Sequence, residues 1–362
     1  MFAAESRQFG TQAAQSAFAM QRALTVADRE AMSHAKRKEA SARRRAKNQA
    51  RGRERKRRRV RARAILPGQS FKLTFGCHEQ RLFLATGEDP ELIRELYGYL
   101  LGLALSKYGL LFHGGNQMGN HHHLDLTDVE GQRPLFKAYF HGFLARALNS
   151  LRGRTGDFWE SGGSCDTVRD NDEESVADLV YTDTNPVSAG LVRWPDRWPG
   201  FHSAGWRFGE TRTFSRPKIS WFDTVDGDWP DEVSITRVRP PCLAKMSDAE
   251  ATAFLADRTR QRCVEKQHEM KQQRRRFKGT DKLRRERWWR RPGSSREDFT
   301  VKPKIAVRTK YRRLAMIQRN KAWEAEYLEA DEAFARGNRD AVYPYGTWLQ
   351  KQRYEVNVAA PP

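Results

Sequence analysis

The clearest hydrophobic pattern in the chain begins near residue 70. Residues 70–76 alternate apolar and polar side chains, which predicts a half-buried strand, and the apolar stretch 81–84 follows it. Asp89 can then cap a helix whose first position suits Pro90. Leucines recur along one face of this helix until Gly109 ends it. The pattern therefore predicts a strand followed by an amphipathic helix.

Five further elements follow, and their order indicates the fold class. They are hairpin arms at 110–113 and 121–126, a helix over 133–152, a strand over 164–169 and a helix from 171 to about 184. The last helix opens with acidic side chains, which a helix N-terminus favours. The order strand, helix, strand, strand, helix, strand, helix is the ferredoxin-like pattern with one extra helix. We therefore expect an α+β fold, with a ferredoxin-like antiparallel sheet and helices on one face.

Changes in amino-acid composition divide the chain into three parts. Residues 1–66 are a polar and then strongly basic arm, disordered or helical, and residues 67–203 hold the predicted α+β domain. Residues 204–362 combine a Trp-, Pro- and Gly-rich stretch with basic helical segments, which predicts a C-terminal extension. A length of 362 residues suits about two domains.

The positive charge is concentrated in two segments. The formal net charge is +21, of which residues 36–63 carry +14 and residues 257–291 carry +10. The rest of the chain is thus slightly acidic. A nearly neutral body with two basic segments favours a polyanionic partner, with nucleic acid ahead of a membrane surface.

Several classes of protein are excluded by what the chain lacks. No window approaches 18 consecutive apolar residues, so we expect no membrane span. The four cysteines lie far apart without a CxxC pair, which argues against a zinc finger or a disulfide framework. Reduced thiols suit a cytoplasmic protein.

Three consecutive histidines are the first candidate for chemistry. His121 and His123 fall on one face of the predicted strand, with Asp125, while His122 points to the other face. Two imidazoles so placed can bind one divalent metal and leave positions open for a substrate. The alternative is incidental surface polarity.

Tyr181 and Asn185 are the second candidate. They lie four residues apart at the end of the last helix, so they share a helical face. Pro186 disfavours helix at Asn185, so we expect the helix to end or kink there. Spacing alone also permits a core tyrosine and a turn asparagine.

These motifs carry a resemblance to a known family. Residues 119–124, Gly-Asn-His-His-His-Leu, resemble the Pro-Asn-His-Val-His-Leu segment of the single-tyrosine HUH transposases. Residues 181–192 are similar to that family's Tyr-(3)-Asn-Pro-Val-(1)-Ala-Gly-Leu-Val segment. Residues 156–160 and 194–199 resemble its Gly-His-Val-Trp-Gln loop and its Pro-rich tail. The branch most resembled is the REP-associated tyrosine transposases, over about residues 70–203.

The resemblance implies a transposase, a single-stranded DNA endonuclease and strand transferase. His121 and His123 would ligate Mg²⁺ or Mn²⁺, and Asn185 would supply a third ligand. Tyr181 would attack the scissile phosphate and form a 5′-phosphotyrosine intermediate. The implied partner is single-stranded or hairpin DNA, with no membrane. Members of the family often dimerise, so the resemblance also implies a homodimer. The implied location is cytoplasmic and associated with the nucleoid.

The chain departs from the family pattern at several positions. His122 stands where a bulky apolar residue is usual, so either a polar partner meets it or that sheet face is partly open. Gly119 replaces a proline, and residues 114–117 are polar or glycine where apolar residues are usual, which predicts a weak hairpin arm. Three roles are open for Asp125: a further metal ligand, a residue that orients His123, or a solvated residue at the strand end.

The basic segments supply the candidate nucleic-acid contacts. Aromatic side chains among them can stack on unpaired bases, so Trp288 is a candidate, although a tryptophan pair buried against the main domain is equally compatible. The other candidates are phosphate-binding arginines. They are Arg43, Arg44, Arg45, Arg57, Arg58, Arg59, Arg274, Arg275 and Arg276.

Three functions compete. The first is the metal-dependent nuclease and strand transferase, active in transposition. The second is a domesticated, non-catalytic DNA- or RNA-binding regulator with the same fold. The third is a replication-initiator type of nicking enzyme. The presence of His121, His123 and Tyr181 together favours an enzyme, because a pure binder has no need of all three.

Overall fold

The computed structural model of the protein describes residues 62–87, 89–161, 163–169, 173–292, 305–307 and 309–361. Most of the predicted N-terminal arm therefore lies outside the described residues. By the contacts between its Cα atoms, the chain from residue 63 to residue 362 forms one compact unit.

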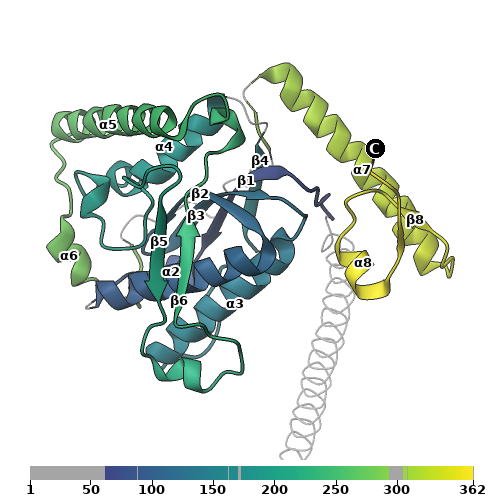
Figure 1. The fold of residues 1–362 in the computed structure, drawn as a ribbon, viewed down its shortest axis with the longest axis horizontal. Coiled ribbons are helices and arrows are strands. Elements are labelled where there is room, and N and C mark those ends of the chain that lie inside the picture. Colours follow the sequence, from purple (N-terminus) through teal and green to yellow (C-terminus); the bar gives the residue numbers. More distant parts are fainter. Residues whose placement is uncertain are drawn as a thin grey trace, which may run out of the picture. The chain divides into compact units, whose positions relative to one another are not determined.

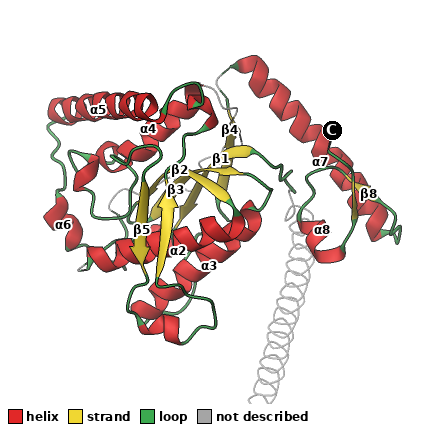
Figure 2. Ribbon diagram, viewed as in Figure 1, coloured by secondary structure: helices red, strands yellow, loops and turns green. Residues whose placement is uncertain are grey.

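A five-stranded sheet forms the centre of this unit (Figures 1 and 2). The strand order is β2-β3-β1-β4-β7, in which the first four strands pair antiparallel and β7 runs parallel to β4. The strands are β1 (Gln69–Gly76), β2 (Leu110–Gln117), β3 (His121–Asp128), β4 (Cys165–Arg169) and β7 (Ile305–Ala306). The α+β class is confirmed, and the fifth strand is an addition from the C-terminal part that the sequence did not predict.

Local signals set the ends of the two helices that follow β1 and β3. Helix α2 (Pro90–Tyr108) begins where the Asp89 side chain accepts a hydrogen bond from the Leu92 amide, and it ends at Gly109 with a φ of 64°. A positive φ is easy for glycine because it has no Cβ. Helix α3 (Arg133–Leu151) also has a proline in its first turn. Both helices lie where the hydrophobic pattern places them.

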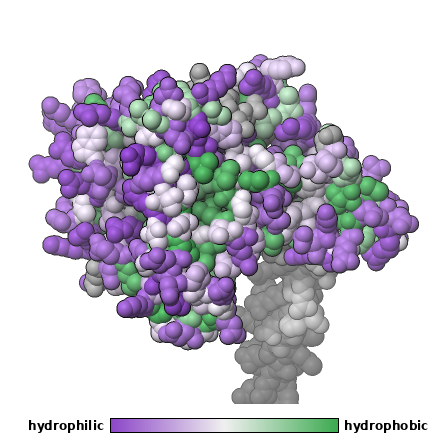
Figure 3. Space-filling view, viewed as in Figure 1, coloured by the Kyte–Doolittle hydropathy of each residue, from purple (hydrophilic) through white to green (hydrophobic). Residues whose placement is uncertain are grey.

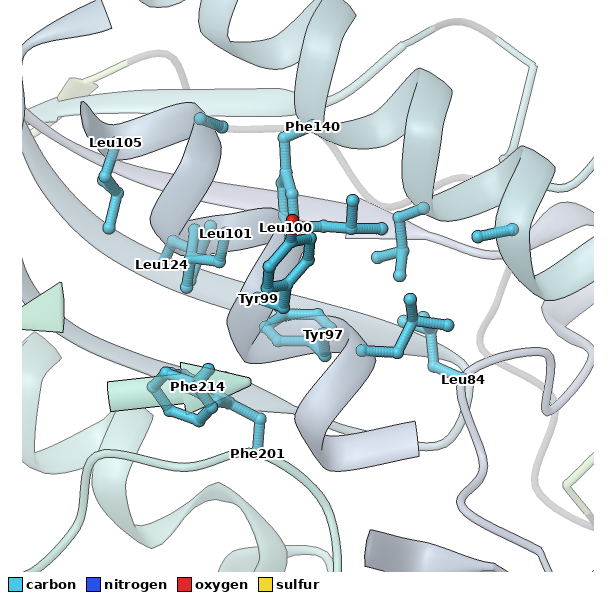
Figure 4. Close-up of a cluster of buried hydrophobic side chains, with 14 of the residues drawn as sticks. Leu84, Tyr97, Tyr99, Leu100, Leu101, Leu105, Leu124, Phe140, Phe201 and Phe214 are labelled. Atoms are coloured by element: carbon cyan, nitrogen blue, oxygen red, sulfur yellow. The ribbon is translucent and has the colours of Figure 1, made fainter. Parts of the chain in front are cut away.

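Helices α2 and α3 cover one face of the sheet and form the main core with it. Phe71, Leu73 and Leu124 point from the strands into this layer, and each is at most 1% exposed. Tyr97 of α2 lies 5.0 Å from Phe201 by ring centroids, and Figure 4 shows these two rings within the same cluster as residues of the strands and helices. The core therefore includes chain from beyond the predicted sheet elements.

The opposite face of the sheet is covered by α4 (Glu173–Ser188), with α5 (Asp248–Gln272) packed against α4. Contacts place α4 there, because Tyr181 meets His123 and Thr182 meets Asp125, which both point away from the main core. The prediction of helices on one face is thus wrong in this respect. Helix α4 buries polar side chains on the sheet face that carries His121 and His123, so these groups need hydrogen-bond partners within the interface.

Of the two outcomes expected at Asn185, an end or a kink, the helix does not end there: α4 continues to Ser188, with Pro186 inside it. Pro186 has no amide hydrogen, so in a regular helix the carbonyl of Thr182 would lose its donor. The Asn116 side chain replaces that donor, with Nδ2 donating to the Thr182 carbonyl at 3.2 Å. A strand of the sheet therefore completes the hydrogen bonding of the helix, which sequence-local reasoning could not foresee.

A two-stranded hairpin packs on the outer side of α2 (Figure 1). Its strands are β5 (Thr211–Ser215) and β6 (Glu232–Thr236). Gly98 and Gly102 lie one turn apart on α2, and a Cβ at Gly102 would come within 2.7 Å of Val233. At Gly98 a Cβ would collide with the ring of Phe214. Only glycine permits the hairpin to lie this close to the helix.

The remaining elements follow the hairpin or lie in connecting segments. The domain boundary proposed between residues 203 and 204 stays a prediction. The further helices are α6 (Thr280–Arg284), α7 (Lys310–Ala335) and α8 (Leu349–Tyr354). The short strands β8 (Val342–Tyr343) and β9 (Asn357–Val358) pair parallel. The 3₁₀ turns are η1 (His78–Gln80), η2 (Pro195–Arg197), η3 (Ser220–Asp223) and η4 (Pro241–Leu243). Among the described residues, no helix is long and apolar enough to cross a membrane.

The contact between Asn116 and α4 yields a stability prediction. Asn116→Ala leaves the buried Thr182 carbonyl without its donor, which we expect to lower the free energy of unfolding by about 1–3 kcal/mol. Pro186→Ala supplies a main-chain amide to the same carbonyl. In the Pro186→Ala background, Asn116→Ala should therefore lower the free energy of unfolding by less. Urea unfolding of the two single variants and the double variant measures this difference. An equal cost in both backgrounds would contradict the assignment, and Asn357→Ala, at an exposed position, serves as the control.

Candidate active site

His121 and His123 lie side by side at the start of β3. Their register partners on β1 are Gly76 and Thr74, so both imidazoles project from the face that α4 covers. The two ring centroids are 4.8 Å apart. His123 is buried at 5% exposure, whereas His121 is partly exposed. The predicted pairing of these two residues on one strand face is therefore what the structure shows.

Hydrogen bonds at Nδ1 orient both rings. Nδ1 of His121 lies 2.8 Å from Oδ1 of Asn120, and an amide oxygen accepts only, so Nδ1 carries the proton. In a neutral imidazole the lone pair is then on Nε2. Nδ1 of His123 lies 2.9 Å from the hydroxyl of Thr74. Such contacts at one ring nitrogen are typical of histidines that offer the other nitrogen to a metal.

Tyr181 lies beside these histidines within the same chain. Its ring centroid is 5.5 Å from that of His123, with the planes at 72°. It is 47% exposed, so the phenol is accessible to a substrate from solution. The ammonium of Lys72 lies 4.2 Å from the centroid of the Tyr181 ring, which is cation–π geometry. No local pattern in the sequence predicts a lysine against this tyrosine.

Lys72 belongs to a charged group beneath the tyrosine helix. Its Nζ is 3.4 Å from the carbonyl and 4.0 Å from the carboxylate of Asp178, and Asp178 also pairs with Arg169. Burial lowers the pKa of Lys72 to about 8, although the nearby Asp125 carboxylate raises it. The ammonium is therefore still mostly protonated at neutral pH.

Asp125 is engaged within this group and is not a solvated strand end. It is 6% exposed, its Oδ2 accepts from the Thr182 hydroxyl at 2.6 Å, and its Oδ1 lies 3.7 Å from Arg169. These contacts tie β3 to the middle of α4. Its described partners are thus Thr182 and Arg169, and the suggested roles of metal ligand and partner of His123 find no support in them.

His122 points into the main core and has polar partners there. The Tyr97 hydroxyl lies 2.6 Å from its Nδ1, and Nε2 of His141 lies 3.1 Å from its Nε2. Burial lowers the pKa of His122 to about 3, with a smaller effect of His121, so the ring is neutral. Of the two alternatives for this position, the structure has the buried histidine with a polar partner.

Glu160 is a further carboxylate at the histidine end of the sheet. Its amide donates to the Gly76 carbonyl at 2.9 Å, and a Cβ on Gly76 would lie 3.3 Å from its Oε2. Because Gly76 is the register partner of His121, this carboxylate occupies the space that a Gly76 side chain would fill on the His121 face. In the sequence, Glu160 lies in the loop of residues 156–160, and the resemblance assigns no role to this carboxylate.

His121 and His123 supply only part of the ligands that a bound metal ion needs. No group of three or more His, Cys, Asp and Glu side chains converges to hold an ion in the described part of the chain. The two imidazoles would have to be completed by water and a substrate phosphate, as Mg²⁺ often is. Asn185 is 5% exposed and follows Tyr181 by four residues on α4. Its part in metal binding stays a prediction.

The two tryptophans of the second basic segment take different positions. Trp288 packs against the main core, 6.1 Å from the Phe83 ring, with the Arg152 guanidinium 5.4 Å from its own ring. Trp289 is 46% exposed. Trp288, the residue proposed to stack on bases, is therefore a packing residue, and its neighbour is the accessible one.

The basic candidates are described only in part. Arg274, Arg275 and Arg276 follow α5 and are exposed. On the face shown in Figure 3, hydrophilic side chains dominate the surface over α5 and α6. The candidates of the N-terminal arm lie outside the described residues. These are Arg43, Arg44, Arg45, Arg57, Arg58 and Arg59.

The comparisons with known proteins find similarity among solved structures. No family model and no curated protein matches the chain. Among solved structures, it is similar to that of a REP-associated tyrosine transposase bound to a REP hairpin, at 16% sequence identity and a TM-score of 0.31. The match covers 40% of this chain and 81% of that chain.

The buried His122 predicts a dependence of stability on pH. Its pKa is lower in the folded state than in the unfolded state, so between about pH 6.5 and 3 the unfolded state binds more protons. Stability is therefore lost as the pH falls through 6.5, by about 2 kcal/mol at pH 5 from this residue. His122→Gln keeps polar groups that can bond to Tyr97 and His141. It should reduce the slope of the free energy of unfolding against pH.

Urea unfolding at pH 7.5 and pH 5, with a chelator present, measures the effect. His268→Gln on α5 is the control, because that side chain is exposed in the folded protein. If His122→Gln and the wild type lose the same free energy of unfolding between the two pH values, the attribution to His122 is wrong.

Proposed function

We propose that this protein is a metal-dependent single-stranded DNA nuclease and strand transferase of the single-tyrosine type, a transposase. One observation carries the proposal: the accessible phenol of Tyr181 lies against His123, with His121 next to it, on a single chain. A nucleophile, two imidazoles and the family-like motifs around them thus occupy one place. The strand order β2-β3-β1-β4 also agrees with the ferredoxin-like sheet of that family.

The reaction is a transesterification at phosphorus. The Tyr181 oxygen attacks the scissile phosphate and gives up its proton, the bond from phosphorus to the 3′ oxygen breaks, and that oxygen takes up a proton. The products are a 5′-phosphotyrosyl protein and a free 3′-OH. The energy of the phosphodiester is kept in the covalent intermediate, so the same 3′-OH or another can rejoin the strand without a nucleotide cofactor.

The residues around Tyr181 have distinct tasks in this scheme. His121 and His123 would hold Mg²⁺ or Mn²⁺, which when bound supplies polarisation of the phosphate and stabilises its developing charge. Lys72 holds the tyrosine ring by a cation–π contact and places a positive charge against the nucleophile's ring. Asn116 fixes the helix turn that follows Tyr181. The nucleophile is thus positioned by β1 and β2 as well as by α4.

The proposed substrate is single-stranded or hairpin DNA, held by exposed arginines outside the reacting centre. Contacts to phosphates give an affinity that falls steeply with salt. A homodimer and an association with the nucleoid belong to the same proposal. A regulator that binds nucleic acid without cleavage is the alternative, and the assay below separates the two.

A covalent adduct is the direct test of the proposal. Incubation with Mn²⁺ and single-stranded oligonucleotides that contain hairpins should give a protein–DNA species that survives denaturing gels. We use Mn²⁺ first because imidazole is a softer donor than the oxygens that Mg²⁺ prefers. Tyr181→Phe should abolish the adduct, and His121→Ala or His123→Ala should reduce it by on the order of a hundredfold or more.

Tyr354→Phe is the matched control, because Tyr354 is 57% exposed and lies on α8. It should leave adduct formation unchanged. An adduct that persists in Tyr181→Phe would refute the nucleophile. Binding without any adduct, for every hairpin end tested with the wild type, would favour the regulator.

Lys72 gives a second prediction for the same assay. Lys72→Met removes the charge against the Tyr181 ring, and we expect adduct formation to slow by on the order of tenfold to a hundredfold. Lys72→Arg should recover part of the rate, since it restores the charge. Asp178 keeps Arg169 as its ion-pair partner, so the variant should stay folded, which thermal unfolding checks. An adduct rate equal to wild type in Lys72→Met would show that the lysine has only a structural part.

A further inference from the structure

Trp289 is an exposed aromatic side chain in a strongly basic surface. Its indole is 46% exposed, and it stands nearly perpendicular to Trp288, at 84° with ring centroids 5.3 Å apart. Exposure of a tryptophan leaves a large apolar face in water, and this face is available to a planar ligand. Trp288, by contrast, is held against the Phe83 ring.

The main chain around Trp289 is fixed to the sheet domain. The Trp289 carbonyl accepts a hydrogen bond from Nη1 of Arg81 at 2.9 Å. The next carbonyl, of Arg290, accepts from the Leu82 amide at 2.9 Å. With Trp288 packed against the core on one side and these two bonds on the other, the main chain that carries the exposed indole is held in place. Preorganisation lowers the entropy lost when a ligand binds.

The charge around this surface suits phosphates. Residues 274–291 contain ten Lys and Arg and two acidic residues, and all ten cations are exposed. The Arg287 guanidinium lies over the Trp289 ring, 5.3 Å from its centroid, and Arg290 follows Trp289 directly, while Arg291 pairs with Glu79 at 2.8 Å. A planar aromatic face flanked by guanidinium groups is the arrangement that binds unpaired bases and their phosphates.

A chain of contacts connects this surface to the candidate active site. Arg81, which holds Trp289, follows the turn that contains Gln80. The Gln80 side chain accepts from Asn120 at 3.3 Å, and Asn120 in turn accepts from His121. Trp289 therefore belongs to the same end of the sheet as the two histidines.

We propose that Trp289 is a stacking platform for an unpaired base of a bound single-stranded nucleic acid, with Arg287 and Arg290 meeting the adjacent phosphates. The inference rests on the nucleic-acid partner of the proposed function and not on its chemistry. Base stacking needs neither metal nor nucleophile, so binding can be measured without cleavage.

The experiment compares two strands of equal length and charge. One is a fluorescein-labelled oligothymidylate, and the other has the same backbone with abasic sites throughout. Anisotropy titrations use the full chain carrying Tyr181→Phe, in a chelator and at fixed salt. Trp289→Ala should weaken binding of the oligothymidylate by roughly tenfold and leave the abasic strand unchanged. The slope of affinity against salt should also stay the same, because no phosphate contact is lost.

Two control variants define a specific loss. Trp194→Ala removes another exposed tryptophan, 36% exposed, and should change neither strand's affinity. Trp289→Phe keeps an aromatic face and should recover most of the oligothymidylate affinity. An oligouridylate arm shows whether the platform accepts RNA as well as DNA. Equal affinity of the wild type and Trp289→Ala for oligothymidylate, or an equal loss for both strands, would overturn the proposal.

This inference and the proposed function fail separately. An adduct from the wild type combined with no effect of Trp289→Ala would refute only the stacking platform. A base-dependent loss in Trp289→Ala combined with no adduct from any strand would refute only the nuclease.

Discussion

The structure depends on one constraint: helix α4 lies on a sheet face made of polar side chains, and burying such a group costs free energy unless it is hydrogen-bonded. Water is excluded beneath the helix, so an unpaired donor or acceptor would cost more than its hydrogen bond contributes. The partners come from both sides of the interface. The Asn116 side chain donates to the Thr182 carbonyl, and the Thr182 hydroxyl donates to the Asp125 carboxylate. These bonds fix the register of the helix over the strands, and with it the position of Tyr181.

A second polar contact on the same helix links it to the chain beyond the sheet elements. Asp183 is 2% exposed and pairs with Arg237, whose guanidinium also donates to the carbonyls of His113, Ser203 and Trp206. Burial raises the pKa of Asp183, and the Arg237 charge opposes that rise. A buried charge is tolerated here because its partner is fully hydrogen-bonded. Arg237 comes directly after the β5–β6 hairpin, so the hairpin that packs on α2 also secures the face where α4 lies.

The candidate site is therefore a surface feature built on a buried framework. Tyr181 and His121 reach solvent, whereas Lys72 and His123 beneath them are almost fully buried. This division suits a reaction on a long polymeric substrate: the reacting groups are open to a strand, and the residues that hold them are rigid. The exposed arginines and Trp289 lie outside this framework, where they can meet phosphates and bases without a cost in buried charge.

The sequence by itself determined the main strands and helices between residues 69 and 188 and indicated the candidate site residues. Alternation placed His121 and His123 on one strand face, the caps bounded α2, and the order of elements indicated an α+β fold. Tertiary structure decided what local signals could not encode. Helix α4 runs through Pro186 because a side chain from β2 replaces the missing donor. Lys72 meets Tyr181, and Trp288 packs against the core while Trp289 is exposed, because such contacts join residues far apart in the chain. Patterns of period 2 or 3.6 fix which face a side chain takes, but only packing fixes what it touches.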